Sequence, residues 1–116
     1  RRELQTTQLE LELQAELDKF ALLATLDAQP ASRGRFVALH RRLFDGATFR
    51  DPAGTELGDR YRLAHRLAAR LCWRLGREHL QACHPRKTMD TTALLRALRA
   101  FYHLGPAEKV ARAEAA

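Results

Sequence analysis

The segment RYRLAHRLAARLCWRLGREH, residues 60–79, decides how this chain folds. Its apolar residues recur at every third or fourth position, a spacing that places them along one face of an α-helix. Six arginines stand between them, and no proline interrupts the pattern. The segment therefore predicts the centre of a long, basic helix from about residue 56 to about residue 82.

The predicted helix has a core face about 100° wide and an arginine-rich sector opposite to it. The core face contains Leu57, Tyr61, Ala64, Ala68, Leu71, Cys72, Leu75 and Ala82. The opposite sector contains Arg62, Arg66, Arg70, Arg74 and Arg77. Trp73 lies within that sector, whereas a core tryptophan would lie among the leucines. We therefore expect an indole on a basic surface.

An earlier helix, predicted from about residue 4 to about residue 28, has two apolar strips. One strip contains Leu9, Leu13, Leu17, Phe20 and Ala24. The other lies on roughly the opposite side and contains Leu4, Leu11, Ala15, Leu22 and Leu26. A helix of a single small domain cannot bury both strips unless it lies at the centre of the bundle. We expect the second strip to be a seam for another helix.

The remaining pattern predicts two shorter helices, over residues 32–44 and 90–104, and a helical or frayed tail over residues 106–116. The stretch DGATFRDPAGTELG, residues 45–58, is the one substantial loop, and we expect Phe49 to insert from it into the bundle. Residues 1–116 are thus predicted to form a single all-α domain, a four-helix bundle-like fold with a long first and a long basic third helix.

Composition limits the classes of function. The formal net charge is +6, with 17 arginines against 3 lysines, which favours acidic partners, although a GC-rich coding sequence produces the same bias. No apolar run is long enough to span a membrane. Two cysteines, Cys72 and Cys83, form no CxxC motif, so we expect a reducing, cytoplasmic setting. Because the chain starts at Arg1 rather than at a methionine, we expect it to belong to a longer polypeptide.

The sequence contains few candidates for catalysis or cofactor binding. Phosphate-binding glycine loops and a calcium-loop pattern are missing, and His79, Cys83 and His84 do not complete a zinc site. We therefore predict no metal, no cofactor, no small-molecule substrate and no enzymatic activity.

One catalytic alternative stays open. The R-x4-H pattern of metal-independent HEPN-type ribonucleases occurs at Arg35/His40, Arg60/His65 and Arg74/His79. The residue after each arginine is apolar or aromatic, where that family normally has a polar one. We keep a HEPN-like ribonuclease as the second alternative, after the favoured interaction module and the nucleic-acid-binding alternative described next.

The arginine sector has three interpretations: a solvated helix face, a protein-binding surface centred on Trp73, or a surface that follows nucleic-acid phosphates. Since no helix-turn-helix or zinc finger is visible, we favour a protein–protein interaction or oligomerisation module over sequence-nonspecific nucleic-acid binding. The expected partners are a second copy or a partner helix at the seam, and an acidic protein or nucleic acid at the basic face. That face is predicted to comprise Arg62, Arg66, Arg70, Trp73, Arg74, Arg77, Arg96 and Arg99.

Overall fold

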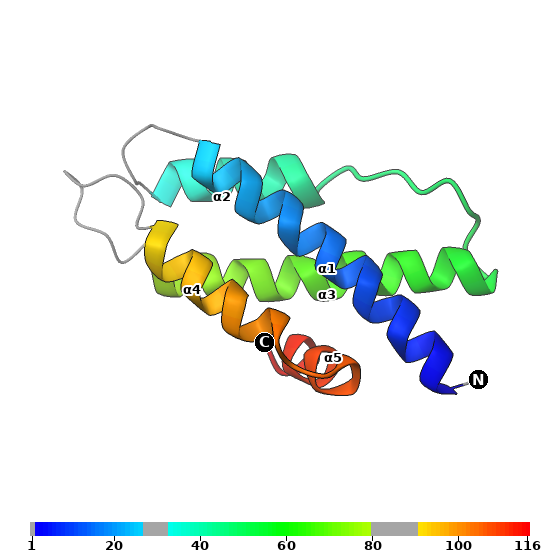
Figure 1. The fold of residues 1–116 in the computed structure, drawn as a ribbon. Coiled ribbons are helices and arrows are strands. Elements are labelled where there is room, and N and C mark those ends of the chain that lie inside the picture. The colour runs from blue at the N-terminus through cyan, green and yellow to red at the C-terminus, as the bar shows by residue number, and fades with distance from the viewer. Residues whose placement is uncertain (1, 27–32, 80–90) are drawn as a thin grey trace.

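The computed structural model describes the backbone of residues 2–26, 33–79 and 91–116, and the side chains of residues 7–25, 37–79 and 92–116. Within these ranges the chain forms only helices, which confirms the all-α prediction. The helices are α1 (Arg2–Leu26), α2 (Arg33–Phe44), α3 (Glu56–His79), α4 (Thr91–Tyr102) and α5 (Pro106–Ala115), as Figure 1 shows. Predicted helix ends at 27–28, 80–82 and 90 lie outside the described residues.

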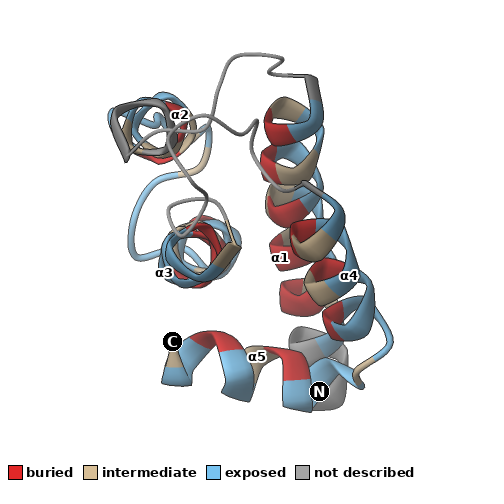
Figure 2. Ribbon diagram, turned by 90° about the vertical axis from the view of Figure 1, so that its left-hand side faces the viewer, coloured by how far each residue is buried: buried red, intermediate tan, exposed pale blue. Residues whose placement is uncertain are grey.

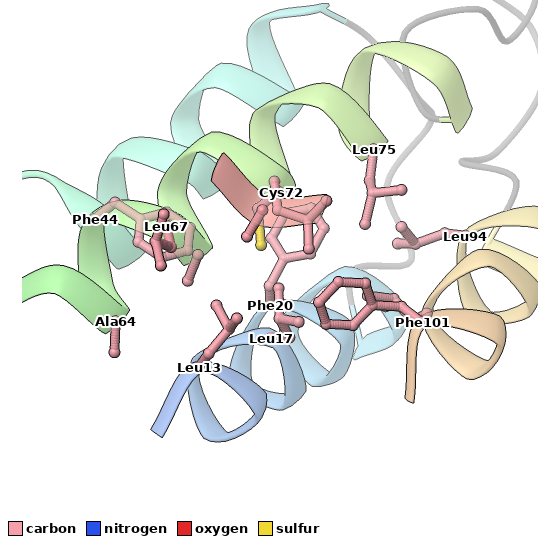
Figure 3. Packing of buried hydrophobic residues seen from close by; sticks show 14 of the residues in the cluster. Leu13, Leu17, Phe20, Phe44, Ala64, Leu67, Cys72, Leu75, Leu94 and Phe101 are labelled. Atoms are coloured by element: carbon pink, nitrogen blue, oxygen red, sulfur yellow. The ribbon is translucent and has the colours of Figure 1, made fainter. Parts of the chain in front are cut away.

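The two long helices, α1 and α3, cross at the centre of the molecule and turn their buried faces toward each other (Figure 2). The strip predicted as the core face of α1 is indeed buried, and Leu13, Leu17 and Phe20 have no exposed surface. Phe20 lies close to Cys72 of α3, while Leu94 and Phe101 of α4 complete this part of the core (Figure 3). Burial of these side chains is the main source of stability.

The start of α3 is fixed by local hydrogen bonds. The Thr55 hydroxyl accepts a hydrogen bond from the Gly58 N–H at 3.1 Å and donates one to the Pro52 carbonyl at 2.6 Å. The Asp59 carboxylate accepts another from the Gly54 N–H at 2.8 Å. These are the bonds of an N-terminal cap, so the loop and the helix end form one unit. A Cβ on Gly58 would stand only 2.1 Å from the Pro52 carbonyl oxygen, so glycine is required there.

The C-terminal tail, predicted to be helical or frayed, is helical. Residues 106–115 form α5, which packs across α1 and α3, so the described residues form five helices where the sequence predicted a four-helix bundle-like fold. Pro106 stands at the start of α5, where its missing N–H leaves no helical bond unmade. Lys109 and Ala113 are buried, so the tail is an integral part of the domain.

The core face of α3 also differs in detail. Leu57 and Tyr61 are partly exposed, whereas Leu67, which the sequence pattern left out, is buried. The buried sector of α3 is wider than predicted because α3 packs against α2, α4 and α5 as well as α1. Phe49 does not enter the core: it lies half-buried on the outside of α3, edge-on to His65 at a centroid distance of 5.4 Å.

Candidate interaction surfaces

The outward face of α1 carries a strip of uncovered apolar side chains. Leu11 is 60% exposed and Leu22 is 58% exposed, and Ala15 between them is exposed as well. We call these three residues the outer strip. They belong to the seam predicted from the sequence, whose other members, Leu4 and Leu26, have side chains outside the described residues. Because the opposite face of α1 is fully buried, the helix is apolar on two sides and covered on one.

The outer strip forms a ridge between two hollows, each of about 490 Å³. The first, the helix hollow, lies between α1, the end of α4 and α5. The second, the loop hollow, lies between α1, α3 and the α2–α3 connection. Ala15 lines both hollows, and Leu11 lines the helix hollow. The surface around the strip is therefore contoured rather than flat.

The helix hollow contains a buried ion pair and an unsatisfied acceptor. Lys109 of α5, only 3% exposed, forms an ion pair with Glu10 of α1, and its ammonium lies 5.0 Å from the centre of the Tyr102 ring. The Gln14 amide donates to the Asp18 carboxylate at 3.0 Å. Its Oε1 is buried and accepts no hydrogen bond from any described residue. Because this oxygen has almost no accessible surface, it is an internal polar atom rather than a docking point.

The loop hollow contains a chain of ionisable groups. Arg60 donates to Glu12 at 2.9 Å. Glu16 lies between Lys19, at 3.1 Å, and the His65 ring, at 3.8 Å. Glu12 and Glu16 are thus both paired with cations of their own chain. The exposed cations at the edge of this hollow are Lys19, which pairs with Glu16 of its own helix, and Arg50.

The exposed sector of α3, which faces away from α1, is basic. Arg66, Arg70, Arg74 and Arg77 are all exposed there. Arg74 pairs with Glu78 at 3.1 Å, whereas no described carboxylate pairs with the other three. We call Arg66, Arg70, Trp73, Arg74 and Arg77 the basic face. Its positive charge is thus largely uncompensated by neighbouring side chains.

Trp73 lies at the edge of this face, where α3 meets α2. The indole is 37% exposed, and its ring stands edge-on to His40 of α2 at a centroid distance of 5.1 Å. His40 is itself held by a hydrogen bond from its ring nitrogen to the Ala69 carbonyl at 2.8 Å. The indole is therefore fixed by α2 and presents only part of its surface to solvent.

Three of the arginines assigned to the basic face from sequence lie elsewhere or have another role. The Arg62 guanidinium folds back onto the loop, where it donates to the Asp51 carbonyl at 2.8 Å and lies 4.8 Å from the centre of the Phe49 ring. It stabilises the loop instead of facing solvent. Arg96 and Arg99 are exposed on α4, and no described contact joins them to the arginines of α3.

The residues considered for catalysis are occupied by structural contacts. The His65 ring bonds to the Phe44 carbonyl at 3.0 Å, and Arg60 pairs with Glu12 rather than with His65. His79 lies 3.7 Å from Glu78, which also pairs with Arg74. The side chain of Arg35 lies outside the described residues.

Neither a metal site nor a membrane span is found in the part of the chain that the structure describes. No group of three or more His, Cys, Asp or Glu side chains is arranged there to hold a metal ion. Cys83 and His84 lie outside that part. Among the described helices, none combines the length and the apolar character needed to cross a bilayer.

Cys72 is a free, fully buried thiol. Desolvation by burial raises the pKa of this thiol well above its ordinary value, and the negative charge of Glu16 raises it further. Since the thiolate is the reactive form of cysteine, Cys72 is a core residue rather than a nucleophile.

Sequence reasoning missed the polar groups that border the outer strip. Gln14, Asp18 and Lys19 read as ordinary solvated positions of an amphipathic helix. The only signal was position, because at 100° per residue Asp18 and Lys19 fall on either side of the line from Leu11 to Leu22. Their polar partners among the described residues lie within α1 itself, since Gln14 donates to Asp18 and Lys19 pairs with Glu16, but the two hollows that they border are closed by α5 and by the α2–α3 loop.

Comparisons with known protein families, curated proteins and solved structures gave no match.

Proposed function

We propose that this chain is a non-catalytic helical interaction module that associates with a second copy or a partner helix through the outer strip of α1. The observation that carries the proposal is the pair of leucines, Leu11 and Leu22, more than half exposed on a helix whose other face is buried. Covering such side chains gains about 1.5–3 kcal/mol for each leucine that becomes fully buried. The buried, free thiol of Cys72 suits the reducing, intracellular setting that we propose for it.

The first test is self-association. We expect light scattering to report a dimer or larger species for the wild-type chain, and Leu11→Glu with Leu22→Glu to convert it into a monomer. Circular dichroism checks that the variant stays helical. Leu57→Glu, at a partly exposed leucine of α3 away from the strip, is the matched control and should not dissociate the protein. A wild-type monomer at every protein concentration would leave only a different chain as the occupant of the strip.

The basic face supports a second function, binding of an acidic protein surface or of nucleic acid. The supporting observation is that Arg66, Arg70 and Arg77 are exposed without a carboxylate partner among the described residues, next to a half-exposed indole. Arginines near a tryptophan are common at protein interfaces, and they also follow phosphates beside a base-stacking ring. The first use is favoured because α2 covers part of the indole.

Salt dependence separates the two uses of the basic face. If the partner is nucleic acid, a plot of the logarithm of the association constant for a short oligonucleotide against the logarithm of salt concentration should have a negative slope. The size of that slope should be roughly one unit per phosphate contacted. Arg70→Glu with Arg77→Glu should reduce both affinity and slope. Absence of a gel shift for the wild-type chain at low salt would remove nucleic acid and leave an acidic protein as the partner.

A further inference from the structure

Two side chains of opposite charge stand on opposite borders of the outer strip. Asp18 lines the helix hollow and Lys19 lines the loop hollow, and both are exposed. The loop-hollow border also holds the exposed Arg50. The exposed charge is therefore negative on the first border and positive on the second, where Glu12 and Glu16 are already paired with cations of the same chain.

This distribution of charge makes the surface complementary to itself. We propose that the occupant of the outer strip is a second copy of this chain, with the two α1 helices parallel and related by a two-fold axis that runs along them. The inference rests on the proposed function. In this arrangement the negative border of each copy meets the positive border of the other. Asp18 of each copy then lies beside Lys19 of the other copy, so the dimer contains two such contacts.

The apolar residues fit the same arrangement. Leu11 and Leu22 are 11 residues apart, three helical turns, so they lie on one line about 16 Å long. A parallel two-fold axis places each leucine against its own equivalent. The small side chain of Ala15 lies between them and lets the two helices approach closely at the centre of the contact.

An antiparallel pair would not be complementary. A two-fold axis perpendicular to α1 brings each border of the strip against the same border of the second copy. Asp18 would then face Asp18, and Lys19 would face Lys19. Like charges placed opposite each other disfavour association and are a common means of fixing orientation. The charges therefore select the parallel arrangement.

Charge exchange tests the contact between the borders. Asp18→Lys and Lys19→Glu should each weaken the dimer by about tenfold, because each places two like-charged pairs across the interface. An equimolar mixture of the two variants should recover wild-type affinity, because every pair then joins opposite charges. Sedimentation velocity measures the dissociation constants of each variant alone and of their equimolar mixture, for comparison with the wild-type chain. Circular dichroism checks folding. A dimer that neither variant weakens overturns the proposed contact.

Orientation is tested with a spin label. In a Cys83→Ser background, Thr25→Cys carries the label at an exposed position of α1. The parallel dimer brings the two labels within about 15 Å, whereas the antiparallel dimer that pairs Leu11 with Leu22 separates them by about 25 Å.

The outcomes of these experiments separate the two proposals. Labels about 25 Å apart in a dimer that Leu11→Glu and Leu22→Glu dissociate would overturn the parallel arrangement and leave self-association through the strip intact. A monomeric wild-type chain would overturn the second copy as occupant. A dimer that withstands the leucine substitutions would show that the chain associates through another surface, which overturns both proposals.

Discussion

At the scale of single residues, neighbouring positions of one helix have opposite environments. Phe20 of α1 has no exposed surface, and Leu22, two residues later, is mostly exposed. The difference follows from the helical period, since 200° of rotation moves a side chain from the α3 side to the outer side. Composition does not separate these two residues, because both are large and apolar. Their position on the helix does.

Cys72 gives a pH prediction at this scale. Because burial raises the pKa of its thiol, the native chain keeps the proton at pH values where the unfolded chain has lost it. The protonated thiol of Cys72 therefore stabilises the native chain relative to the unfolded chain, and this stabilisation is fully present below about pH 8.5. Above that value the free energy of unfolding decreases as the pH rises, by at most about 1.4 kcal/mol per pH unit. Urea unfolding of the wild-type chain and of Cys72→Ala, at about pH 7.5 and about pH 9.5, measures the difference. Equal losses of stability in the two proteins would contradict the prediction.

At the scale of elements, α5 is held to α1 by the buried pair of Lys109 and Glu10. Lys109→Met leaves a carboxylate buried without its partner, so we expect a loss of about 3–5 kcal/mol of stability. Glu10→Leu combined with Lys109→Met removes both charges and should recover most of that loss. Urea unfolding of the single and double variants gives the coupling energy between the two positions.

The exposed pair of Arg74 and Glu78 is the matched control for this prediction. Arg74→Ala should cost less than about 1 kcal/mol, because an ion pair in water gains little over the separately hydrated charges. A small cost for Lys109→Met, similar to that for Arg74→Ala, would mean that α5 separates readily from α1 and lets Glu10 reach water.

At the scale of the whole molecule, the outer strip and the basic face lie on different sides. The strip lies on α1 opposite its buried face, and the basic face lies on the exposed sector of α3. We therefore expect the two surfaces to act independently. Arg70→Glu with Arg77→Glu should leave self-association unchanged in light scattering. Leu11→Glu with Leu22→Glu should leave the affinity per chain for a short acidic ligand unchanged. A change in either quantity would indicate that the two surfaces are coupled.

The sequence by itself determined the helical class of this protein and the faces of its long helices. The period of 3.6 residues is local, so the buried strip of α1 and the arginine sector of α3 can be read from spacing alone. The same reasoning predicted an outward strip on α1, since one helix of a small domain cannot cover two faces. What it missed was confined to packing between elements distant in sequence.

Only the tertiary structure decided which side chains of each helix are buried, which are exposed and which are held by contacts with other segments. The packing of α5 decided in favour of a helix where the sequence left a helical or a frayed tail open, and tertiary packing added Leu67 to the buried face of α3. The loop that packs against α3 drew Arg62 away from solvent, and α2 covered part of Trp73. Folding also brings Arg50, from the α2–α3 loop, to the border of the outer strip. Such contacts join residues tens of positions apart, and no local periodicity encodes which segments will meet.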